Sequence, residues 1–159
     1  MRRIANIITV VLFLQIAPSI SCLELGTGLE TGGDMRVCIA VETMSEDARQ
    51  TNLSRELIKS KVELQLRRNG ITPTDYATGI ELGYFLYINI NIVGSAFGER
   101  IAFCRRVTYM VGNKRYEMLA TTWHKGATGR YADNPRLLID DLLDDIDIFC
   151  SEFLSANGK

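Results

Sequence analysis

The sequence has little of what catalysis and metal binding require. Its 159 residues include a single histidine, His124, and four cysteines, none of them in C-x-x-C spacing. A Ser-His-Asp or Cys-His arrangement would have to use His124, and no G-x-S-x-G nucleophile motif occurs. A zinc site generally takes three or four ligands, and a single histidine with no C-x-x-C pair is a poor basis for one. We therefore predict no catalytic residues, no metal and no cofactor.

An excess of positive charge is also missing. The chain has 18 basic and 19 acidic residues and a formal net charge of −1. Proteins that bind nucleic acid present a clustered positive surface to the phosphates. We therefore predict no nucleic-acid partner.

The chain lacks an apolar run of the length that a membrane-spanning helix needs. The run Ile4–Ile20 is shorter than the about 20 residues of a span, and Asn6 and Gln15 interrupt it. It follows Met1-Arg2-Arg3 and ends in small residues, which is the three-part pattern of a secretory signal peptide. We predict that residues 1–21 are a signal peptide and that the protein is exported, with an uncleaved anchor as the alternative.

The residue after the predicted cleavage site is Cys22. A small residue before a cysteine resembles the bacterial lipoprotein box, although Pro18 and Ser19 stand where that motif has larger aliphatic residues. With a lipid on Cys22 the protein would be a membrane-anchored lipoprotein; without it, the protein would be free in the periplasm or secreted. Both states stay open, and membrane contact is expected only through this anchor.

Export favours disulfide formation, because disulfides persist in oxidising compartments. Cys38, Cys104 and Cys150 fall in three separate predicted elements. We predict one long-range disulfide among these three, which would stabilise the fold by roughly 2–4 kcal/mol. The alternative is that they are buried free thiols.

Residues 22–34 are rich in glycine and predict a flexible leader, and residues 35–157 predict a single α+β domain. Alternating apolar residues predict four strands, and apolar stripes at helical spacing predict two amphipathic helices. The strands are 35–43, 83–93, 101–111 and 115–123, and the helices run from about 52 to 69 and from 134 onward. Gly112-Asn113 predicts a two-residue hairpin turn. The order β-α-β-β-β-α implies a two-layer sandwich, with a mostly antiparallel sheet and both helices on one face. We expect the first strand to pair in parallel with a strand of the meander.

One strand has two unlike sides, which makes it a candidate binding surface. Its apolar side predicts a core face: Tyr84, Leu86, Ile88, Ile90 and Ile92. On the other side Tyr87, Asn89 and Asn91 suit solvent or an interface, because tyrosine is enriched in interface cores. We predict that these three residues form a polar-aromatic binding platform.

A second candidate site is the predicted loop after the last strand. It gathers Trp123, Lys125, Arg130 and Tyr131. The aromatic rings offer flat contact surfaces and the cations suit an anionic group. The alternative is a long surface connection in which the glycines ease the turn and Trp123 packs on the final helix.

Four features give the chain a resemblance to known proteins: the alternating first strand from Val37, the tyrosine-rich strand Tyr84–Ile92, the Thr122-Trp123 pair that ends the last predicted strand, and the Leu142–Leu154 helix followed by Asn157. In these features it resembles short exported bacterial proteins to which no activity is assigned. The element order is similar to small periplasmic α/β modules, such as the amino-terminal domain of TolB and envelope lipoproteins of the CsgG and LpoB type. The resemblance implies an envelope location and assigns no site residue.

The sequence predicts an exported, non-enzymatic module that binds an envelope or secreted protein. The alternative is a small-ligand-binding protein that uses the loop at residues 123–131.

Overall fold

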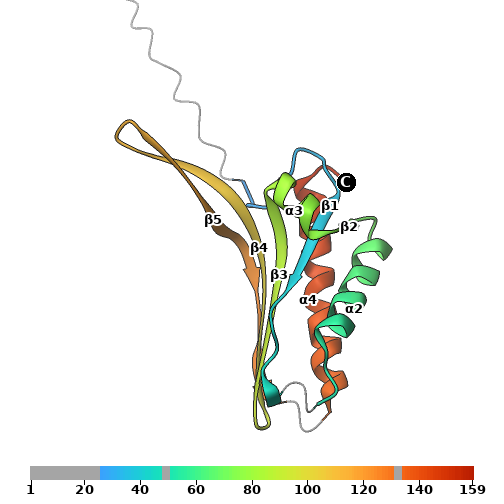
Figure 1. Ribbon diagram of the computed structural model, residues 1–159. Helices are drawn as coiled ribbons and strands as arrows, with labels where there is room; N and C mark the ends of the chain where they lie inside the picture. Colours follow the sequence, from blue (N-terminus) through green and yellow to red (C-terminus); the bar gives the residue numbers. More distant parts are fainter. Residues whose placement is uncertain (1–25, 48–50, 131–133) are drawn as a thin grey trace, which may run out of the picture.

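The computed structural model describes residues 26–47, 51–130 and 134–159. Within these ranges the chain folds into one mixed sheet and three helices, which confirms the predicted α+β class (Figure 1). The strands are β1 (Arg36–Val41), β2 (Thr72–Thr74), β3 (Tyr84–Val93), β4 (Ala96–Val111), β5 (Lys114–Lys125) and β6 (Thr128–Arg130). The helices are α2 (Arg55–Arg68), α3 (Tyr76–Leu82) and α4 (Pro135–Ala156).

The sheet has the strand order β2-β1-β3-β4-β5, with β6 also paired to β4. β1 is parallel to both β2 and β3, and β3, β4 and β5 form an antiparallel meander. Val111 pairs with Lys114 across the two-residue turn, in which Gly112 has a φ of 58°. The predicted parallel pairing and the predicted hairpin turn are therefore both confirmed.

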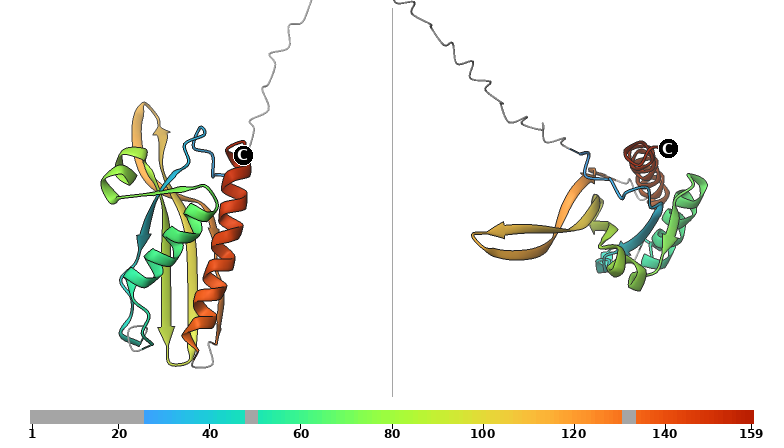
Figure 2. Two further views of the ribbon diagram at one scale, coloured as in Figure 1. Left: turned by 90° about the vertical axis from the view of Figure 1, so that its right-hand side faces the viewer. Right: turned by 90° about the horizontal axis from the view of Figure 1, so that it is seen from above.

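Helices α2 and α4 cover one side of the sheet, which we call the helix face (Figure 2). α2 presents Ile58, Val62 and Leu66, spaced four residues apart on its buried stripe. α4 begins as predicted at Asn134, whose side chain accepts a hydrogen bond from the Arg136 amide. The predicted apolar side of β3 lies against these helices and is buried throughout.

The connection between α2 and β3 holds two elements that the sequence pattern did not predict. β2 adds a strand at the sheet edge, and α3 crosses the side opposite the helix face above β1. Asp75 begins α3 by accepting a hydrogen bond from the Thr78 amide at 2.8 Å, and Gly83 ends it with a φ of 75°. Gly79 lets α3 approach the strand, because a Cβ there would lie 2.5 Å from the Cβ of Cys38.

The predicted disulfide among the three described cysteines is wrong. Cys38, Cys104 and Cys150 are free thiols. Cys38 and Cys104 are both in register with Phe85 of β3, so they stand two strand spacings apart, about 9–10 Å. Disulfides generally need Cα atoms within about 7 Å. Cys150 belongs to the core on the helix face, with the sheet between it and the other two thiols.

The described part of the predicted leader is packed against the body. Leu29 is fully buried in the core. Asn157, just after α4, accepts a hydrogen bond from the Thr31 amide at 2.7 Å and donates one to the Leu29 carbonyl at 3.0 Å. This polar clamp ties the start of the described chain to its end.

β4 and β5 are longer than the layer of helices that covers them. The 16 residues of β4 span about 50 Å, whereas the 22 residues of α4 span about 33 Å. The surplus forms a two-stranded hairpin, residues 105–120, which we call the arm. Figure 1 shows the arm projecting away from the helices at one end of the sheet.

Candidate functional site

The sheet has a second side, opposite the helix face, which we call the open face. Of the described elements, α3 covers the part of this face that includes Cys38. Side chains alternate along a strand, so the buried positions of β3 point to the helices and the intervening ones to the open face. Tyr87, Asn89 and Asn91 therefore share this face, as predicted, and all three are partly or fully exposed.

The three predicted platform residues are joined by hydrogen bonds. The carboxylate of Glu42, on the neighbouring β1 edge, accepts hydrogen bonds from the Tyr87 hydroxyl and the Asn89 amide. Asn91 then donates its side-chain amide to the Asn89 oxygen at 2.9 Å. Burial, followed by the Glu42 hydrogen bond, raises the pKa of the Tyr87 phenol. These hydrogen bonds hold the polar side chains in fixed orientations. The side chains would therefore lose less conformational entropy on binding a partner.

Three cationic or ionisable side chains extend the open face across β4, β5 and β6. Arg100 is in register with Asn89, and His124 is in register with Ala102. Arg130 of β6 is in register with Ala96. All three side chains are exposed. The open face therefore combines amides, a phenol and two arginines on one rigid sheet.

The structure does not assemble the predicted loop at residues 123–131 into one site. β5 continues to Lys125, so strand alternation separates Trp123 and Lys125 from His124. The Trp123 ring packs edge-on against Phe149 of α4, with centroids 5.3 Å apart, on the helix face. Arg130 lies on the open face instead, and Tyr131 lies outside the described residues.

Trp123 and Lys125 are held on the helix face by a hydrogen bond and an ion pair to α4. The indole Nε1 of Trp123 donates to Glu152 at 2.6 Å. The Lys125 Nζ lies 3.5 Å from an oxygen of Asp145 on α4. Both side chains thus help to dock α4 on the sheet.

Glu99 is a buried acid that the sequence analysis missed. It is 5% exposed, and neither carboxyl oxygen has a hydrogen-bond partner among the described residues. Burial, together with the charges of Asp145 and Asp141 on α4, raises the pKa of Glu99 to about 7. Its position two residues before Ile101, on the same side of β4, was the available signal. Within the described ranges no group of histidine, cysteine and acidic residues is arranged to hold a metal ion.

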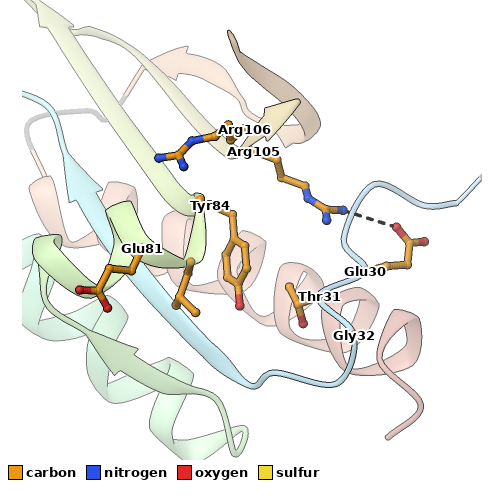
Figure 3. A pocket seen from close by; sticks show the side chains of 9 residues that line it. Glu30, Thr31, Gly32, Glu81, Tyr84, Arg105 and Arg106 are labelled. Atoms are coloured by element: carbon orange, nitrogen blue, oxygen red, sulfur yellow. Dashed lines mark ion pairs between the residues drawn. The ribbon is translucent and has the colours of Figure 1, made fainter. Parts of the chain in front are cut away.

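A hollow of about 540 Å³ lies at the root of the arm (Figure 3). The Arg105 guanidinium lies 4.0 Å from the Glu30 carboxylate. Arg106 donates to the Ile80 carbonyl at 3.0 Å. Burial raises the pKa of the Tyr84 phenol, whose ring lines the hollow with its hydroxyl end toward Thr31. Two glutamates, Glu30 and Glu81, and two arginines, Arg105 and Arg106, line this hollow. Their charges balance, so the hollow does not favour an anionic or a cationic ligand.

No protein-family model and no curated protein matches the chain. The helices within the described ranges also include none that is long and apolar enough to cross a membrane. We therefore infer function from the geometry of the open face and the arm.

Proposed function

We propose that this protein is an exported, non-enzymatic interaction module that binds another envelope or secreted protein through its open face. Residues 1–21 direct export in this proposal, and Cys22 is either the lipid attachment point or the free start of the processed chain. The periplasmic modules that the sequence resembles agree with such a location.

The open face supports this function because, within the described ranges, only α3 covers part of it and because its side chains are chemically mixed. Tyr87, Asn89 and Asn91 stand on a central strand, where a sheet face normally lies against a second layer or against solvent. Their hydrogen-bonded arrangement with Glu42 restricts their motion before any partner arrives. A broad, flat surface of this kind suits a protein partner better than a small ligand, which binds in concave sites.

Charge indicates the chemistry of the partner. Arg100 and Arg130 are exposed on this face, and no ion pair to either is found among the described residues. Arginine pairs with carboxylates in two parallel hydrogen bonds. We infer that the partner presents acidic side chains together with groups that hydrogen-bond the asparagine amides.

Crosslinking in intact cells of the source organism tests this proposal. A photo-reactive amino acid at position 87 or 130 should trap one discrete protein. The matched control is position 61, an exposed lysine of α2 on the other side of the molecule, which should not trap that protein. The proposal is wrong if positions 87 and 130 give no adduct, or if position 61 gives the same one.

Charge reversal tests the chemistry of the contact. Arg100→Glu with Arg130→Glu should abolish the adduct formed from position 87, because like charges would then face each other. Arg67→Glu with Arg68→Glu, at the end of α2, makes the same change in net charge and should leave the adduct intact. Equal loss in both pairs would contradict a specific contact.

A further inference from the structure

The arm exposes an apolar side that no described part of the chain covers. Register pairs Val107 with Met118 and Tyr109 with Tyr116, so these four side chains share one side. The two tyrosine rings stack with centroids 5.5 Å apart. At the tip of the arm Val111, on the same side, is 59% exposed, and Met110, on the opposite side, is 61% exposed. Exposed apolar surface of this extent on a projecting element marks a contact site.

The arm also differs from the rest of the molecule in charge. Residues 105–120 contain four basic residues and one acidic residue, Glu117. Of the remaining residues after position 21, 12 are basic and 18 are acidic. An anionic surface would therefore attract the arm and repel the body, which orients the molecule with the arm toward that surface.

The first described residues lie at the root of the arm. The Gly28 carbonyl accepts a hydrogen bond from the Thr122 hydroxyl at 2.6 Å, and Thr122 stands where β5 enters the arm. Cys22 precedes the first described residue, Gly26, by four positions, a length of chain that reaches at most about 14 Å when fully extended. A lipid or apolar anchor in this segment would hold the membrane at the arm's end of the molecule.

We propose that the arm docks on the surface of a membrane that contains anionic phospholipids. Tyr109 and Tyr116 take the level of the headgroups, where aromatic rings with a polar tip are favoured. Met110 and Val111 reach the acyl boundary, and Lys114 and Arg115 bind lipid phosphates. Two arms packed on each other would bring their like charges together, which disfavours a second copy as the occupant. The docking uses a surface distinct from the open face and does not depend on a partner there.

Two exposed valines, Val111 and Val93, provide a matched pair of labelling positions for testing this proposal. Val111 precedes the glycine of the β4–β5 turn at the tip of the arm. Val93 precedes the glycine of the β3–β4 turn at the opposite end of β4 and is 75% exposed. The full chain carries Cys22→Ser and Cys104→Ser, which prevent lipidation at position 22 and labelling at these two positions, while Cys38 and Cys150 are buried. A polarity-sensitive fluorophore is then attached through Val111→Cys or Val93→Cys.

With vesicles of phosphatidylcholine and about one-third phosphatidylglycerol, the label at position 111 should shift to the blue and brighten. It should not respond to phosphatidylcholine alone, and added salt should weaken the response. The label at position 93 should not respond. Lys114→Gln with Arg115→Gln should weaken vesicle binding about tenfold or more, and Lys59→Gln with Lys61→Gln should not.

Three results would overturn the proposal. They are no response of position 111 to anionic vesicles, an equal response of both positions, and a response of position 111 to protein concentration without any vesicle. The last result would show that the arm contacts another protein molecule instead of lipid.

Discussion

At the scale of single residues, Glu99 is the least expected feature. An acid on the core side of β4 is buried against two further acids of α4, Asp141 and Asp145. Lys125 of β5 neutralises part of that charge by pairing with Asp145 at 3.5 Å. The folded state favours the protonated carboxyl of Glu99, because the uncharged group avoids the cost of burying a charge and the repulsion from Asp141 and Asp145.

This residue predicts a pH-dependent stability. The pKa of Glu99 rises from 4.5 to about 7 on folding, so the folded state binds more protons than the unfolded state between those values. The free energy of unfolding should therefore fall as pH rises from about 4.5 to about 7, by on the order of 3 kcal/mol from this group. Glu99→Gln should remove the loss and leave the protein more stable than the wild type at pH 8. Urea unfolding at pH 5 and pH 8 measures both effects.

Glu117→Gln is the control, because it removes an exposed acid on the arm. It should keep the pH dependence of the wild type. If Glu99→Gln and the wild type lost the same stability between pH 5 and pH 8, Glu99 would not be the group responsible.

At the scale of elements, long regular segments were predictable and short ones were not. The sides of β3, the turn at Gly112 and the start of α4 followed from periodicity and turn chemistry. β2 and α3 were missed because three and seven residues are too few to show a period. The available signals for α3 were its two ends, Asp75 and Gly83.

The sequence predicts only part of the candidate site, because strand alternation shows the two sides of a strand but not where the strand ends. Alternation in β3 identified Tyr87, Asn89 and Asn91 as one side of a strand. Alternation alone does not show where a strand ends, so the sequence pattern predicts a loop where β5 continues to Lys125. Nor does it show how far a covering layer extends: Tyr109 repeats the pattern of Phe103, yet Phe103 is buried and Tyr109 stands on the arm.

The close approach of α3 to β1 gives a prediction for Gly79. Gly79→Ala would place a methyl group 2.5 Å from the Cβ of Cys38, so one of the two elements must move. The variant should lose about 1–3 kcal/mol of unfolding free energy, although alanine is the better helix former. Gly98→Ala is the control, because its nearest atom is a methyl of Thr128 at 3.7 Å. Denaturant unfolding compares the two, and equal stabilities would contradict the packing of α3 on the strand.

At the scale of the whole molecule, the described chain is a one-sided sandwich with an arm. The core lies between the helix face and helices α2 and α4. Among the described residues only α3 covers part of the open face, and the arm extends one end of the sheet. Figure 2 shows the residues just before β1 and the end of α4 at the same end of the molecule as the arm. Partner binding on the open face and membrane docking by the arm are compatible, because they use different surfaces.

Intact-mass analysis of protein from its native host tests export and thiol state together. We expect the mass of a chain that begins at Cys22, with or without an added lipid. After thiol labelling in denaturant, Cys38, Cys104 and Cys150 should each carry one label, because they are free in the fold. An unprocessed Met1, or a missing pair of labels among these three, would contradict the corresponding part of the account.

The most direct test of the central claim measures whether the open face is covered in the cell. Asn91→Cys and Lys61→Cys introduce exposed thiols on the open face and on α2, and labelling is quantified peptide by peptide. In intact cells position 91 should be protected and position 61 labelled, whereas in the purified protein both should be labelled. Equal labelling of the two positions in cells would contradict the proposal that this face binds a partner.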